Sequence, residues 1–144
     1  MFLLLALIAG AFIPVQTGLN SQLSRWVGHP ILAALVSFMV GTAALLAYAL
    51  VVRLPLPASQ SLGQSPWWVW TGGLLGAFFV TASIVVAPRL GAAIALALII
   101  AGQLLVALAL DHFGLLGFPE RPLNGWRVLG AVLLVIGVAL IRRF

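Results

Sequence analysis

Five long apolar runs constrain this chain more than any other feature. They cover residues 1–22, 30–52, 66–87, 91–111 and 125–141 of a sequence of 144 residues. A helix that spans a bilayer needs about 20 mostly apolar residues, and each run is close to that length. The sequence therefore predicts an all-α membrane protein whose residues 1–144 form a single membrane domain with five transmembrane helices.

The composition excludes the soluble classes of protein. Hydrophobic residues make up 64% of the chain and charged residues only 6%, whereas a soluble domain has about 45–50% apolar and about 25% charged residues. Because so few charges cannot cover a soluble surface, nearly all cytoplasmic enzymes are excluded. The chain also has no cysteine, which rules out disulfides and thiolate metal sites.

Prolines and tryptophans indicate where several spans begin and end. Pro30 and Pro66 stand where a first helical turn would start, a position that tolerates proline. Pro88 is expected to end the third span, and longer loops are expected at residues 53–65 and 112–124. Four tryptophans flank the spans, as is typical of the membrane–water interface: Trp26, Trp67, Trp68 and Trp126.

The arginines divide almost evenly between the two sides of the membrane. Five spans place three of the seven on one side (Arg53, Arg121, Arg127) and four on the other (Arg25, Arg89, Arg142, Arg143). An excess of Lys and Arg in cytoplasmic loops sets orientation, so this division predicts a chain that inserts in both orientations. The alternative is that the two C-terminal arginines alone keep that end inside. The net charge of +5 is attributed to arginines that anchor the ends of the spans at the membrane edge, and not to nucleic-acid binding.

The odd number of spans favours an inverted pair of chains. Many transporters consist of two halves of inverted topology with the substrate site between them at the midplane. Two copies of a five-span chain form such a pair only if one copy is upside down. We therefore predict an antiparallel homodimer that forms a ten-helix bundle, with the glycine-rich fifth span at its seam through Gly130 and Gly137.

Polar residues within the spans are the candidate substrate-binding residues. Gln16 and Asn20 are four residues apart and share one face of the first helix, next to Pro14, which is expected to kink it. Gln103 lies near the middle of the fourth span, and Ser37 lies in the second. Polar groups are costly in lipid and usually face the bundle interior. The alternative is that the amides only hydrogen-bond neighbouring helices.

Asp111 and His112 form a separate candidate site at the end of the fourth span. A carboxylate there meets the negative end of the helix dipole, which makes Asp111 a candidate for proton exchange or for an ion pair with an arginine. The simpler interpretation, which we favour, is a helix-ending turn with Gly114 as its C-cap.

No pattern in the sequence indicates catalysis. The chain lacks HExxH, GxSxG, a phosphate loop and any cluster of metal ligands. We therefore expect no enzyme activity, no cofactor and no metal. The middle of each predicted span carries no Asp, Glu, Lys or Arg, so an uncharged or zwitterionic substrate fits better than a strong cation.

Three stretches of the sequence resemble a known family. They are GAFIPVQTGLNSQLSRWVGHPILAALVSFMVGT, APRLGAAIALALIIAGQLLVALALDHFGLLG and LNGWRVLGAVLLVIGVALI. Together they resemble the YdcZ-like family, five-helix and half-sized members of the drug/metabolite transporter superfamily of the bacterial inner membrane. The family's polar first-helix positions fall on Gln16 and Asn20, and its fourth-helix pattern falls on Gln103, Asp111 and His112.

The resemblance implies a secondary transporter or exporter whose members occur as antiparallel homodimers, as unequal pairs or as fused ten-helix proteins. The chain is also similar in size to small multidrug-resistance proteins, but it lacks their first-helix glutamate. We expect alternating access in a dual-topology homodimer, with membrane lipid, a second copy and a small molecule as partners. A passive channel and a subunit of an unequal heterodimer remain the alternatives.

Overall fold

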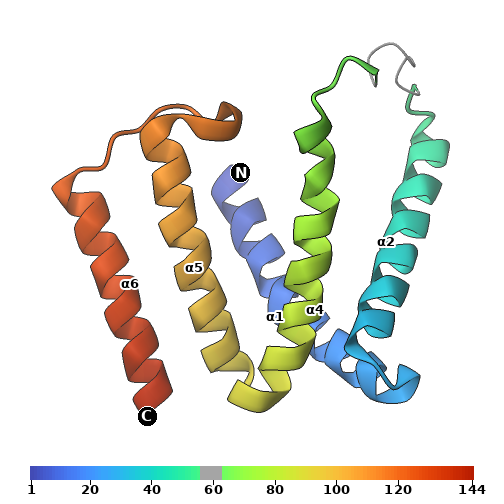
Figure 1. The fold of residues 1–144 in the computed structure, drawn as a ribbon, viewed down its shortest axis with the longest axis horizontal. Coiled ribbons are helices and arrows are strands. Elements are labelled where there is room, and N and C mark those ends of the chain that lie inside the picture. Colours follow the sequence, from blue (N-terminus) through green and yellow to red (C-terminus); the bar gives the residue numbers. More distant parts are fainter. Residues whose placement is uncertain (56–62) are drawn as a thin grey trace. The chain divides into compact units, whose positions relative to one another are not determined.

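All regular structure in the described part of the chain, residues 1–55 and 63–144 of a computed structural model, is helical. Figure 1 shows the long helices, and two short 3-10 helices accompany them. They are α1 (Phe2–Val27), α2 (Pro30–Val52), η1 (Trp67–Thr71), α4 (Gly72–Leu90), α5 (Ala92–Phe113), η2 (Leu115–Gly117) and α6 (Gly125–Arg143). Five helices, with η1 and α4 taken together as one, are long and apolar enough to cross a membrane. The prediction of five helical spans is confirmed, while most of the predicted 53–65 loop lies outside the described residues.

The first helix is longer than its apolar run. It continues past residue 22 to Val27 and ends at Gly28, whose φ of 80° is left-handed. Gln22 and Arg25 reduce hydropathy without breaking a helix, so hydropathy alone places the end too early. Arg25 lies in the last turn, where a cation interacts favourably with the helix dipole.

The structure differs from the sequence prediction at Pro88, because α4 continues past it to Leu90. Pro14 lies inside α1, which continues through it as one helix, and the kink expected there stays a prediction. A proline removes one backbone hydrogen bond, and in each helix the remaining bonds maintain the element. Pro30 lies in the first turn of α2 as predicted, next to His29, whose Nδ1 accepts a hydrogen bond from the Ile31 N–H at 3.2 Å.

The chain forms two compact units, residues 1–88 and 89–144. In the first unit, the end of α1, the start of α2 and the second half of α4 pack around one small core. That core consists of Ala33, Ala34, Val80 and Ile84, with Leu23, Val27 and Phe79 partly buried against it. Three polar residues are buried in the same unit: Asn20, Ser21 and Ser83.

The second unit is an antiparallel hairpin of α5 and α6 with η2 in the connection (Figure 1). Ala95, near the start of α5, and Val138, near the end of α6, are its buried apolar residues. Most large apolar side chains of both units are exposed, which is expected of helices whose surroundings are lipid and other helices.

Candidate functional site

Asn20 is a mostly buried residue of α1 whose side-chain amide has no hydrogen-bond partner in the described chain and reaches the surface of its unit. Only 7% of the residue is exposed, and its amide makes no hydrogen bond within the described residues. The two buried serines differ, because Ser21 Oγ donates to the Thr17 carbonyl and Ser83 Oγ to the Val80 carbonyl, each at 2.8 Å. No buried side-chain nitrogen or oxygen of the described residues lacks a partner, so the Asn20 amide is accessible from outside its unit, and in lipid it would need a polar partner there. The position therefore suits a ligand, a water molecule or a polar group of another chain.

The other predicted binding residues are more accessible. Gln16, one turn before Asn20 on α1, is exposed, Ser37 on α2 is half-buried, and Gln103 on α5 is exposed. None of these three side chains has a hydrogen bond in the part of the chain that the structure describes. The structure thus keeps Gln16 and Asn20 on one helix of the first unit, and places Gln103 in the second unit.

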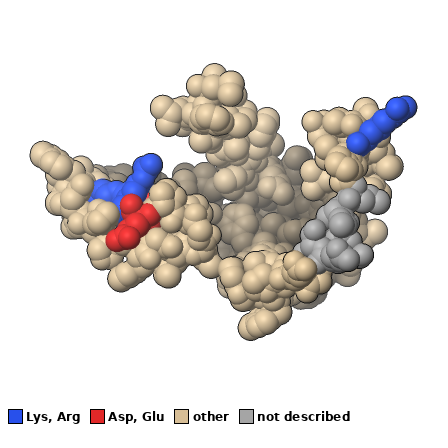
Figure 2. All heavy atoms as spheres, turned by 90° about the horizontal axis from the view of Figure 1, so that it is seen from above, with Lys and Arg blue, Asp and Glu red and all other residues tan. Residues whose placement is uncertain are grey.

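Asp111 forms an ion pair with Arg127. The Arg127 Nη2 lies 2.8 Å from Asp111 Oδ2, and the two side chains are 25% and 28% exposed, Arg127 first. Arg127 Nη1 donates to the Arg121 carbonyl at 2.7 Å, and the Arg121 N–H donates to the Asp111 carbonyl at 2.7 Å. Figure 2 shows acidic and basic atoms side by side on this part of the surface. The sequence analysis named an arginine partner but did not identify Arg127.

The same connection is fixed by three further contacts. Gly114 has a left-handed φ of 58° and its N–H donates to the Leu110 carbonyl, so the predicted C-cap is confirmed beside the ion pair. His112 Nδ1 accepts from the Leu123 N–H at 3.1 Å. Asn124 Oδ1 accepts from the Arg127 N–H at 2.9 Å and caps α6. Asp111 and His112 therefore hold the 114–124 segment against the ends of both helices.

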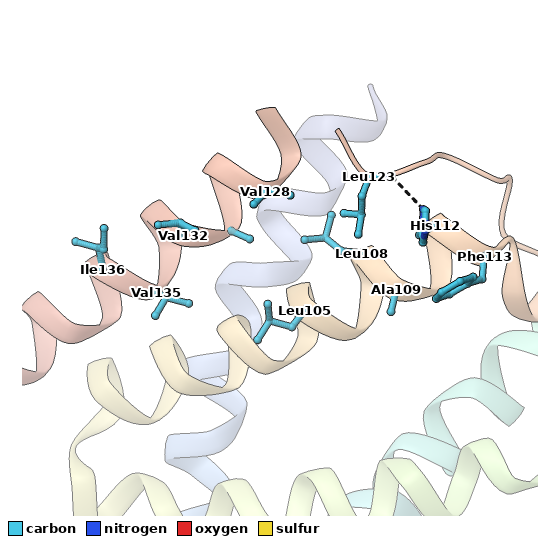
Figure 3. A pocket seen from close by; sticks show the side chains of 11 residues that line it. Leu105, Leu108, Ala109, His112, Phe113, Leu123, Val128, Val132, Val135 and Ile136 are labelled. Atoms are coloured by element: carbon cyan, nitrogen blue, oxygen red, sulfur yellow. Dashed lines mark hydrogen bonds between the residues drawn. The ribbon is translucent and has the colours of Figure 1, made fainter. Parts of the chain in front are cut away.

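An apolar groove of about 540 Å³ lies between α5 and α6 (Figure 3). His112 is the one polar side chain among the residues that line it, and it lies at the loop end. The lining residues are Leu105, Leu108, Ala109, His112, Phe113, Leu123, Val128, Ala131, Val132, Val135 and Ile136. The sequence analysis missed this groove, although Leu105, Leu108, Ala109 and His112 follow the spacing of one helix face.

The chemistry available within the spans is that of neutral polar groups. The charged residues of the described helices lie in the first or last turns, as with Arg25, Arg89, Asp111 and Arg127. Among the described residues, no group of three or more His, Asp or Glu side chains could hold a metal ion. Amides on α1 and α5 can donate and accept hydrogen bonds, but they supply no fixed charge.

Two comparisons with known proteins identify the same family. The family described as "Putative inner membrane exporter, YdcZ" matches residues 1–140. The chain is also similar to Inner membrane protein YdcZ of Escherichia coli (strain K12), with 33% identity over 135 residues that cover 94% of this chain and 90% of that protein. No solved structure matches the chain.

Proposed function

The chain belongs to the YdcZ family of the bacterial inner membrane, and on that premise we propose that it exports a small uncharged or zwitterionic metabolite as an antiparallel dual-topology homodimer. Two inverted copies supply ten helices around one central polar cavity. Gln16, Asn20, Gln103 and Ser37 of both copies line it, and the two halves exchange conformations to give alternating access.

The unpartnered amide of Asn20 is the observation that carries this proposal. Only 7% of the residue is exposed, yet its amide makes no hydrogen bond in the described chain, and its polar atoms reach the surface of the unit. Gln103 presents a second unpartnered amide near the middle of α5. Hydrocarbon cannot form hydrogen bonds with these amides. A polar ligand or a hydrated cavity therefore supplies the hydrogen-bond partners that the single chain does not.

The charge distribution supports a substrate without net charge. Binding a strong cation within a membrane requires a carboxylate that compensates for its lost hydration. The nearest candidate, Asp111, lies in the last turn of α5 and is already paired with Arg127. Amide groups suit hydroxyl, amide or zwitterionic substrates, whose charges are balanced internally.

The glycine face of α6 supports the homodimer. No atom outside the local backbone lies within 4 Å of a Cβ built on Gly130 or Gly137. Glycines with open space before them allow the backbones of two transmembrane helices to approach closely at those positions. With five spans, a symmetric pair of inverted halves requires a second copy in the opposite orientation.

Counterflow in proteoliposomes tests this function. The purified protein is reconstituted, loaded with one unlabelled member of a panel of neutral polyols and amino acids, and given the labelled compound outside. A transporter accelerates uptake when the compound is present on both sides, because the loaded site returns faster than the empty one. Unsaturable flux without acceleration would instead favour a channel, and absence of flux until an unequal homologue is added would favour the heterodimer.

A further inference from the structure

We propose that the groove between α5 and α6 binds a zwitterionic membrane phospholipid that carries a phosphate and a primary amine. One acyl chain lies along the groove, the phosphate is bound at His112 and Arg121, and the amine is bound at Glu120. This site is separate from the proposed transport cavity and does not depend on it.

The groove has the shape and lining that an acyl chain requires. From Leu105 to His112 it follows about 10 Å of α5, at a rise of 1.5 Å per residue. It therefore extends from the middle of the span to the loop end. Its walls are branched apolar side chains, among them Leu108, Val132 and Val135, which face the groove from both helices (Figure 3).

His112 supplies a hydrogen-bond donor at the polar end. Its Nδ1 already accepts from the Leu123 N–H, so the neutral ring carries its proton on Nε2. That nitrogen has no protein partner in the described residues. Because His112 itself lines the groove, a donor is available beside the point where an acyl chain would meet its headgroup.

Two neighbouring residues supply opposite charges without an ion pair. Arg121 has its backbone N–H and carbonyl bonded to Asp111 and Arg127, which fixes its main chain two residues before Leu123 of the groove. The ion pair that the described chain contains is Arg127 with Asp111, and neither the Arg121 guanidinium nor the Glu120 carboxylate takes part in one there. One unpaired cation beside one unpaired anion complements a phosphate and an ammonium group.

A helix from a second copy of the chain fits a different face of α6 better than it fits the groove. At about 100° per residue, Val128, Val132 and Val135 lie within roughly 60° of one another around the helix. Gly130 and Gly137 lie on the opposite side, flanked there by Leu133 and Leu134, and have open space before them. Glycines let another helix approach closely, so Gly130 and Gly137 are the positions of α6 that suit a partner helix, whereas the groove side has branched residues at Val128, Val132 and Val135.

Native mass spectrometry of the purified full-length protein tests the site. The probe is an equimolar mixture of phosphatidylethanolamine and phosphatidylglycerol added in detergent. We expect the wild type to retain phosphatidylethanolamine, and Val132→Phe, or independently Val135→Phe, to lose most of it by filling the groove. Val106→Phe is the matched control, because Val106 is an exposed α5 residue that does not line the groove. Circular dichroism verifies that each variant is folded.

Arg121 and Glu120, at the loop end of the groove, should determine which of the two phospholipids is retained. Arg121→Gln should reduce retention of both lipids, while Glu120→Gln should shift the preference from phosphatidylethanolamine to phosphatidylglycerol. Equal retention by Val132→Phe and Val106→Phe, or no retained lipid in the wild type, overturns the proposal. Loss of the dimer without loss of lipid in Val132→Phe also overturns it, because a second copy would then occupy the groove.

Discussion

Arg127 Nη2 lies 2.8 Å from Asp111 Oδ2 and joins the start of α6 to the end of α5 across 16 positions of sequence. The same guanidinium holds the Arg121 carbonyl, so one side chain fixes both the helix end and the loop between the helices. Both partners lie at the edge of their spans, where water and headgroups are close. Asp111, which the sequence suggested as a candidate for proton exchange, thus has a structural role as the partner of Arg127.

Replacing Asp111 by Asn should destabilise the α5–α6 hairpin. The pair is about a quarter exposed, so its loss should cost about 1 kcal/mol, more than a fully solvated surface pair. The free energy of unfolding, measured by SDS titration, checks this value. A double-mutant cycle with Arg127→Gln isolates the coupling, and Glu120→Gln is the control without an ion pair. A coupling energy near zero would contradict the structural role.

Replacing Gly114 by Ala should destabilise the same connection. The φ of 58° is unfavourable for a side chain, and a Cβ would lie 3.4 Å from the Glu120 Cβ. A left-handed residue other than glycine costs about 1–2 kcal/mol. Gly102→Ala is the control, because Gly102 is helical and has nothing within 4 Å, so alanine there should be neutral or stabilising. Equal stability of the two variants would mean that the C-cap contributes little.

Replacing Asn20 by Ala should weaken transport without weakening the fold. If the amide hydrogen-bonds the substrate, its loss costs about 1.4 kcal/mol, or roughly a tenfold increase in KM. The free energy of unfolding should be unchanged or higher, because the amide has no hydrogen-bond partner in the described part of the folded chain. Gln22→Ala, on an exposed residue of the same helix, should leave both quantities unchanged. Lower stability with an unchanged KM would instead support packing between helices as the role of Asn20.

Replacing Gly137 by Leu should dissociate the proposed homodimer. A leucine side chain would keep apart the two backbones that the open glycine face allows to approach. The dimer fraction in detergent, measured by analytical ultracentrifugation, should fall. Ala139→Leu adds bulk to the same helix on a different face and should leave the dimer intact. Dissociation by Ala139→Leu alone would place the seam elsewhere on α6.

The sequence predicted the spans well because lipid imposes a simple requirement on composition. Helix ends were less predictable: α1 continues to Val27 because a helix tolerates Gln22 and Arg25 at the membrane edge, and α4 passes Pro88 because one lost hydrogen bond does not end a helix. Gly114 was identifiable from its position after the last apolar residue.

The side-chain partners in the site were the least predictable part. Arg127 meets Asp111 only because the 114–124 segment folds back. That path depends on three residues of positive φ, Gly114, Leu116 and Gly117, and on the contact between His112 and Leu123. Asn20 and Gln16 share a helix face, yet Asn20 alone is buried, because burial depends on how α1 packs with α2 and α4. The helical period predicts which residues share a face of a helix, but not which other helix packs against that face.

Orientation in the membrane tests the central claim, an antiparallel homodimer, most directly. The chain has no native cysteine, so Ser59→Cys in the second loop and, in another variant, Phe144→Cys can each be labelled in intact cells with an impermeant maleimide. An odd number of spans puts these two positions on opposite sides of the membrane. Partial labelling of both would show two orientations, as an antiparallel homodimer requires. Complete labelling of one position and none of the other would show a single fixed orientation and contradict it.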